Sequence, residues 1–209
     1  MKTLNARLKG KLLSAVLLVL AVALLTGFIS KRARARLAFD PDTTIQRNDA
    51  RAREAFLAAV PVLKHPRCLN CHSTGDFPRQ GDDGHVHMQN VRRGTDGKGK
   101  YGQKCGACHQ EQNVAGLNMP PGAPNWHLPP AATPMIWEGR TPGDICGQIK
   151  DPKQNNGKSL AQIIEHVTSD KLVIWGWNPG EGRTPPPLSH DEFAAKFQDW
   201  VRYGAACPE

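Results

Sequence analysis

Two short stretches, Cys68-Leu-Asn-Cys71-His72 and Cys105-Gly-Ala-Cys108-His109, share the pattern Cys-x-x-Cys-His. This pattern is the signature by which a chain attaches haem c covalently. Two thiols one helical turn apart add to the two vinyl groups of one porphyrin, and the adjoining imidazole is held beneath the iron. The sequence therefore predicts two haem c groups. The expected thioether cysteines are Cys68, Cys71, Cys105 and Cys108, and the expected proximal iron ligands are His72 and His109.

A zinc site and a redox dithiol are the two other interpretations of paired cysteines. The 33 residues between Cys71 and Cys105 exceed the roughly 15–20 that separate the pairs of common four-cysteine zinc sites. A histidine directly after each pair has no role in either alternative. Only 32 residues lie between the two motifs. They are too few for a separate core, so both haems are expected in one domain.

Four helices are expected, and each has a start signal in the sequence. The later three signals place a capping residue before an apolar face with helical spacing. The first helix is expected to be interrupted near Pro61, because proline lacks the backbone N–H that a helix interior needs. The start signals are Asn48 or Asp49, Thr141, Ser159 and Ser189.

Long loops account for much of the remaining chain. Residues 73–104 show little periodicity, and residues 113–140 carry too many prolines to be helical. Loops of this length are easier to understand if they wrap a cofactor. No segment shows the alternation of a strand. We therefore expect residues 48–209 to form an all-α, loop-rich, cytochrome c-like domain with two covalently bound haems.

The N-terminal residues predict a membrane anchor. The segment from Leu12 to Ile29 is an apolar stretch of 18 residues with basic residues on both sides, and no small-residue cleavage site follows it. We expect a single transmembrane helix within residues 1–30 and a tether over residues 31–47, with a cleaved signal peptide as the alternative. Bacteria attach haem c on the periplasmic side of the inner membrane, so the haem domain is expected in the periplasm.

The net charge of +8 comes entirely from the N-terminal residues. Residues 1–36 hold 8 of the 27 Lys and Arg residues and no Asp or Glu, which leaves 19 basic and 19 acidic residues beyond them. The domain is formally neutral, so no nucleic-acid partner is expected. The partner that the N-terminal helix indicates is the membrane.

The distal iron ligands must come from residues outside the two motifs. His87 and His127 lie in the long loops, and because a loop can aim a ring at an iron, they are the expected distal ligands. Methionine ligation would raise the reduction potential relative to two imidazoles. His166 falls at the edge of the apolar stripe of its helix and is expected to be an interface histidine. The alternatives for the distal positions are His85, Met119 and Met135.

Cys146 and Cys207 are the two cysteines outside the haem motifs. Disulfides persist in the periplasm. A bond between these cysteines would close a loop of about 60 residues and add roughly 4 kcal/mol of stability in the chain-entropy model. Two buried free thiols are the alternative.

Four stretches, together spanning about residues 60–208, carry a resemblance to a known family. They resemble bacterial c-type cytochrome proteins labelled isoquinoline 1-oxidoreductase subunits. The resemblance implies an accessory electron carrier for a periplasmic molybdenum hydroxylase. The only paired cysteines belong to the haem motifs, so hydroxylase chemistry would belong to a partner protein. The stretches are Gly81-Asp-Asp-Gly-His-Val-His, Gly122-Ala-Pro-Asn-Trp-His-Leu-Pro-Pro, Asp151-Pro-Lys-Gln-Asn-Asn-Gly, and Trp175-Gly-Trp-Asn-Pro-Gly through Pro-Pro-Pro-Leu-Ser-His-Asp-Glu-Phe.

The sequence as a whole predicts a membrane-anchored periplasmic dihaem cytochrome c. It would pass electrons from a dehydrogenase to a downstream acceptor, as a carrier and not as an enzyme. A small dihaem peroxidase and a haem-based sensor remain as alternatives. Both need one iron with an open coordination site, which distinguishes them from a carrier whose irons each have six ligands.

Overall fold

The computed structural model describes residues 46–209. The predicted transmembrane helix and nearly all of the tether fall outside these residues. Within residues 46–209, no helix combines the length and the apolar character that crossing a membrane requires. This part of the chain is helix-rich and has little strand.

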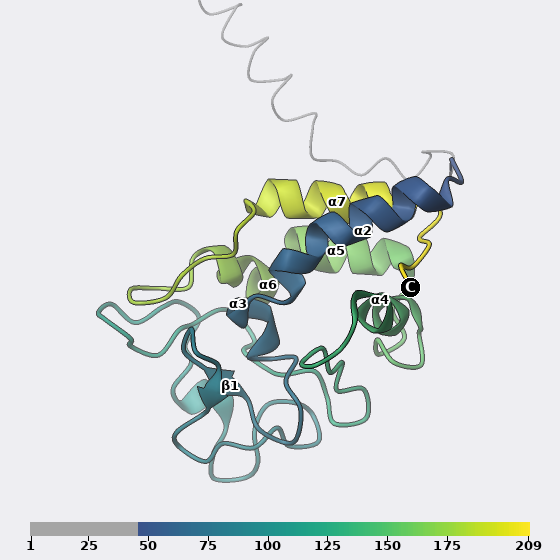
Figure 1. Ribbon diagram of the computed structural model, residues 1–209. Coiled ribbons are helices and arrows are strands. Elements are labelled where there is room, and N and C mark those ends of the chain that lie inside the picture. The colour runs from purple at the N-terminus through teal and green to yellow at the C-terminus, as the bar shows by residue number, and fades with distance from the viewer. Residues whose placement is uncertain (1–45) are drawn as a thin grey trace, which may run out of the picture. The chain divides into compact units, whose positions relative to one another are not determined.

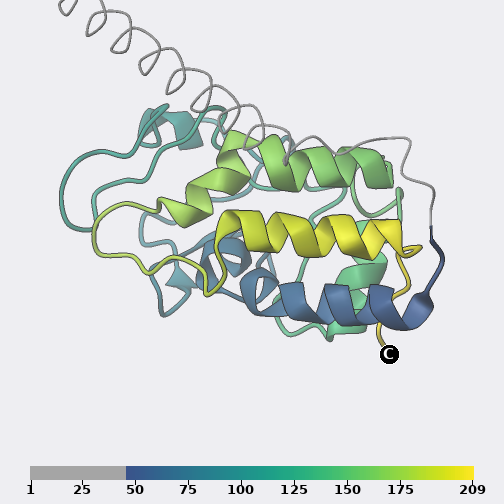
Figure 2. The same cartoon turned by 90° about the horizontal axis from the view of Figure 1, so that it is seen from above.

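Three helices form a layer in which α7 lies between α2 and α5 (Figure 2). The core between α2 and α7 is aromatic. Phe56 lies against Phe197 and Trp200, with ring centroids 6.1 and 5.3 Å apart. Such pairs contribute roughly 0.5–1.5 kcal/mol beyond the burial of their apolar area. The bounds of the layer's helices are Asp49–Leu63 for α2, Leu160–Ser169 for α5 and His190–Arg202 for α7.

The predicted helix starts are confirmed. Thr141, Ser159 and Ser189 begin α4 (Pro142–Lys150), α5 and α7, and each side chain accepts a hydrogen bond from the backbone N–H three residues later. The acidic or amide side chain at that later position bonds back to the capping residue in all three helices, which completes a capping box. At the start of α2, the side chain of Asn48 accepts a hydrogen bond from a backbone N–H.

The expected interruption of the first helix near Pro61 is wrong, because α2 continues through this residue to Leu63. Pro61 stands in the last turn of the helix, where its missing N–H leaves only the carbonyl of Leu57 without a helical partner. Leu57 is exposed, so water can bond to that carbonyl.

A short hairpin interrupts the first long loop, where no strand was expected. The strands β1 (Arg79–Gln80) and β2 (His85–Val86) pair antiparallel, with Arg79 opposite Val86. The Gly-Asp-Asp-Gly turn that joins them has positive φ angles of 73° and 65° at its two glycines, a conformation that glycine adopts without steric cost. The domain is therefore mostly, but not purely, α.

Short helices and loops occupy the side of the helix layer where α3 and β1 lie (Figure 1). The two long loops contact each other there. The backbone N–H of Leu128 donates to the carbonyl of Gly97 at 2.9 Å. Gly97 has φ +77°, and a Cβ at this position would lie 1.9 Å from the Leu128 oxygen. The close approach of the loops therefore requires glycine.

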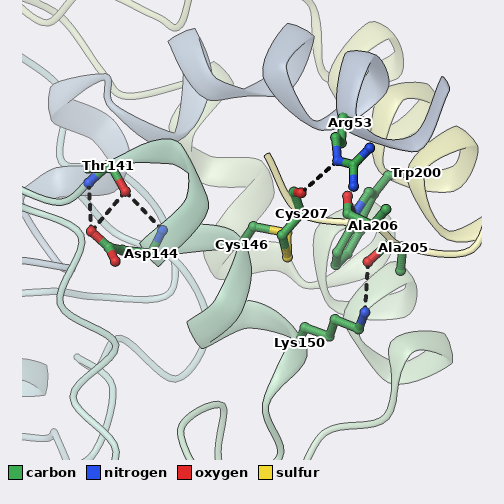
Figure 3. The surroundings of a disulfide bond; sticks show 9 residues. All are labelled: Arg53, Thr141, Asp144, Cys146, Lys150, Trp200, Ala205, Ala206 and Cys207. Carbon is green, nitrogen blue, oxygen red and sulfur yellow. Dashed lines mark hydrogen bonds between the residues drawn. A yellow bond between two sulfur atoms is a disulfide. The ribbon is translucent and has the colours of Figure 1, made fainter. Parts of the chain in front are cut away.

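Cys146 of α4 and Cys207 of the C-terminal tail form a disulfide, with Cα atoms 5.6 Å apart (Figure 3). Two hydrogen bonds hold the same tail. Nε of Arg53 in α2 donates to the carbonyl of Cys207 at 3.0 Å, and Nζ of Lys150 donates to the carbonyl of Ala205 at 3.0 Å. The tail is thus fixed to both α4 and α2.

Candidate metal and cofactor sites

The two Cys-x-x-Cys-His motifs fold into the same tight turn. In each motif the carbonyl of the first cysteine accepts hydrogen bonds from the N–H groups of the second cysteine and of the histidine. These bonds measure 3.1 and 3.1 Å at the first motif and 3.1 and 2.9 Å at the second. The first motif begins in the last two residues of α3 (Pro66–Leu69), and the second begins with η1 (Cys105–Ala107).

The histidines of the two motifs are held in the same way. Nδ1 of His72 donates to the carbonyl of Met135 at 2.8 Å, and Nδ1 of His109 donates to the carbonyl of Pro121 at 2.7 Å. A carbonyl oxygen can only accept, so each Nδ1 carries the hydrogen. Each Nε2 therefore keeps a free lone pair, as the imidazole of a metal ligand does.

A tryptophan stacks on each of these imidazoles. Trp137 lies parallel to the ring of His72, with centroids 3.5 Å apart and planes inclined by 6°. Trp126 lies against His109 in the same way, at 4.4 Å and 2°. The sequence did not predict these contacts, because nothing local to either motif indicates them.

The first motif opens into a large pocket. The pocket holds about 1240 Å³ of empty space, including the part that is open to solvent. Cys68, Cys71 and His72 line it from the motif, while Ile163 and Phe193 line it from α5 and α7.

Burial keeps the groups of the first motif uncharged at neutral pH. It raises the pKa of Cys68 to about 12 and that of Cys71 to about 11, and nearby charges add smaller effects. Burial also lowers the pKa of His72 to about 3. The imidazole is therefore neutral, which is the form that binds a metal.

Several buried polar groups of the pocket lack a protein partner. Nε of Arg67, Nε1 of Trp137 and Oγ1 of Thr133 make no hydrogen bond, and all three residues line the pocket. Buried polar groups nearly always have a partner, so a ligand rich in acceptors would satisfy them. The pocket thus offers two thiols, an imidazole with a free Nε2 and unpaired donors for the propionate carboxylates of a porphyrin. These groups fit a covalently attached haem.

The second motif lies closer to the surface. Cys108 is exposed, whereas Cys105 and His109 are half-buried. The ring of His87 lies near that of His109, with centroids 6.3 Å apart and planes inclined by 66°. Nδ1 of His87 is buried without a hydrogen-bond partner. Two imidazoles that bind one metal at about 2.0 Å hold their centroids roughly 6 Å apart. His87 and His109 therefore have the separation of two axial ligands.

Two further histidines face the first motif. His127, an expected distal ligand, lines the pocket, and its Nδ1 donates to the carbonyl of Asn125 at 2.5 Å. His166, which the sequence assigned to an interface, lines the same pocket, and its Nδ1 donates to the carboxylate of Asp170 at 3.0 Å. The sequence signal that could have identified His166 as a candidate ligand is the carboxylate four residues after it, at Asp170.

The three alternative distal ligands lie in different surroundings. Met119 and His85 are exposed, and Nδ1 of His85 bonds to the side chain of Asp83. Met135 lines the pocket of the first motif and provides the carbonyl that accepts from His72.

The two motifs are neighbours in the fold. Trp175 of η2 (Trp175–Trp177) lines the pocket of the first motif. Its ring lies edge-on to Trp126, with centroids 4.8 Å apart. Packed side chains therefore connect the first pocket to the second motif.

Within residues 46–209, no group of three or more His, Cys, Asp or Glu side chains is arranged to hold a metal ion by itself. A haem takes at most two axial ligands from the chain, so this finding concerns protein-only metal sites. Comparison of the chain with protein-family models, with curated proteins and with solved structures found no match.

Proposed function

We propose that this chain is a dihaem cytochrome c, with one haem attached at each Cys-x-x-Cys-His motif. The observation that carries the proposal is the repeated environment of His72 and His109. Each imidazole donates Nδ1–H to a backbone carbonyl, stacks on a tryptophan and keeps Nε2 free. An axial ligand needs this tautomer and this fixed orientation. The environment recurs at two sites whose flanking sequences differ, so a shared function explains it better than packing does.

The proposed activity is electron transfer. When bound, haem supplies a one-electron couple between ferric and ferrous iron. The chain's part would be to hold each imidazole rigidly and to provide a second imidazole for an iron. The separation of His87 and His109 supports such a six-coordinate site. An iron with six fixed ligands exchanges electrons without binding a substrate.

The exposure of the second motif supports a role for it in contact with redox partners. Cys108 is exposed, whereas Cys68 and Cys71 lie in the pocket of the first motif. Electrons would pass between a partner protein and the domain at the second haem. By resemblance, the donor is a dehydrogenase of the periplasmic molybdenum hydroxylase class. The proposed N-terminal anchor would keep the carrier at the inner membrane while it passes electrons to a downstream acceptor.

Haem quantitation tests the attachment directly. The full chain is produced in a host with haem c maturation, and covalent haem is counted by intact mass and by absorbance. We expect two haems in the parent chain and one after the paired change Cys68→Ser with Cys71→Ser, or Cys105→Ser with Cys108→Ser. The control Cys207→Ser, which lies outside both motifs, keeps two. A parent chain without covalent haem, despite competent maturation, overturns the proposal.

Electron paramagnetic resonance of the ferric protein separates the carrier from its alternatives. Two low-spin signals are expected, because each iron of a carrier has six ligands. A substantial high-spin signal would instead favour the peroxidase or the sensor, in which one iron is open.

A further inference from the structure

One face of α5 is turned towards the pocket of the first motif. Ile163, His166 and Val167 all line this pocket. Residues three and four positions apart share a helix face, so His166 lies on the side of α5 that faces His72. Ile163 and Val167 are buried on either side of it, and this packing fixes the face that carries the imidazole.

The ring of His166 is oriented by a carboxylate. Its Nδ1 lies 3.0 Å from Oδ2 of Asp170, and Oδ1 of Asp170 accepts from the backbone N–H of Leu172 at 2.8 Å. Asp170 thereby caps α6 (Lys171–Ile174) directly after the end of α5. A carboxylate oxygen accepts, so Nδ1 of His166 carries the hydrogen and Nε2 is left as a lone-pair donor.

From this arrangement, we infer that His166 is the distal iron ligand at the first motif, with Asp170 as its positioning residue. The inference rests on the proposed function, because it assigns a ligand to a haem whose attachment is itself proposed. A histidine that donates its second N–H to a carboxylate is the usual arrangement at metal sites, and the carboxylate makes the imidazole a stronger donor.

His127 is the competing ligand, since it lines the same pocket. Its ring is held by the carbonyl of Asn125, two residues away in an extended loop. His166 instead stands on a helix that packs against α7, and its carboxylate partner is fixed at the junction of α5 and α6. A ligand on a packed helix keeps its geometry more tightly than one on a loop.

Two single variants of the full, haem-loaded chain test the assignment. For His166→Ala, we expect two covalent haems but a change of one low-spin ferric signal to a high-spin signal that accounts for half of the iron. Imidazole added to this variant should restore the low-spin signal. For His127→Ala, which removes the other imidazole of the same pocket, both low-spin signals should persist.

The reverse pattern, with the high-spin signal in His127→Ala only, overturns the inference in favour of His127. Persistence of both low-spin signals in both variants overturns it as well, because neither histidine then binds the iron. A parent chain that carries no covalent haem contradicts the proposed function itself, so the two failures are distinguishable.

The variant Asp170→Asn tests the positioning role without removing the ligand or the capping oxygen. We expect both haems to stay low-spin and the midpoint potential of one haem to rise, because a neutral partner weakens donation by the imidazole to ferric iron. The control Asp199→Asn, whose half-buried carboxylate pairs with Arg202 on α7, should leave both potentials unchanged. This readout remains informative if His166→Ala fails to mature, and an unshifted potential in Asp170→Asn overturns the assignment of Asp170.

Discussion

The imidazole rings of His87 and His109 lie with their centroids 6.3 Å apart and their planes inclined by 66°. His87 is nearer to His72 along the chain, yet the fold pairs it with the histidine of the second motif. Burial lowers the pKa of both imidazoles, so both are neutral at neutral pH and able to bind a metal. This contact provides a specific expectation for the second site.

Loss of His87 should open the second iron. In the haem-loaded chain, His87→Ala is expected to retain two haems and to convert one low-spin ferric signal to a high-spin signal, because His109 would then be the only axial ligand from the chain. Electron paramagnetic resonance with and without added imidazole measures this change. The matched control is His85→Ala, since His85 is exposed on the same hairpin. A high-spin signal in the control and not in His87→Ala would contradict the pairing.

Asp82 should contribute stability that depends on pH. Its carboxylate pairs with Arg67, whose side chain is 1% exposed, and accepts two hydrogen bonds from Thr184. Burial raises the pKa of Asp82, but the bonds from Thr184 and the charge of Arg67 outweigh it and lower the pKa overall. Because the pKa is lower in the folded than in the unfolded chain, the stabilisation is present above the unfolded value of about 3.9 and is lost as the pH falls through the folded value.

For Asp82→Asn we expect a loss of about 2 kcal/mol at pH 7. Removal of one partner leaves the buried Arg67 unpaired, but partial exposure of Asp82 reduces the cost. Urea unfolding at pH 7, 5 and 3 measures the difference from the parent chain, which should shrink at pH 3. The control Asp83→Asn removes a neighbouring exposed carboxylate and should cost much less. An Asp82→Asn difference that is equal at all three pH values would rule out the linkage.

The extent to which the sequence predicted the fold depends on the range of the interactions. The caps at Thr141, Ser159 and Ser189 are confirmed because a capping box involves only four consecutive positions. The stacking of Trp137 on His72 joins segments far apart in the chain. Its geometry depends on Met135, which has a φ of +47° that no local sequence pattern predicted. The pairing of His87 with His109 is non-local in the same way. Local chemistry therefore predicted the helices and the motif residues, whereas the groups opposite the motif histidines required the tertiary structure.

The contact between the two long loops should depend on the absence of a side chain at Gly97. Gly97→Ala adds a Cβ that would lie 1.9 Å from the Leu128 oxygen, at a φ of +77°. We expect a loss of about 3 kcal/mol from backbone strain and steric clash together. The matched control is Gly102→Ala, which has a φ of +83° but no atom within 4 Å of the added Cβ. It should cost only the strain, roughly 1–2 kcal/mol. Equal losses in urea unfolding would show that the Leu128 contact does not restrict position 97.

The disulfide between Cys146 and Cys207 should stabilise the domain without affecting the candidate haem sites. The two cysteines are 61 residues apart in the sequence, and a loop of that length corresponds to about 4 kcal/mol in the chain-entropy model. Cys207→Ala, Cys146→Ala and the double variant should each lose nearly this amount, because removal of either sulfur opens the whole loop. Urea unfolding measures the losses, and the visible spectrum of the haem-loaded chain serves as the control. Additive losses from the two single variants would indicate that each thiol contributes only through its own packing, since the second substitution has no bond left to break.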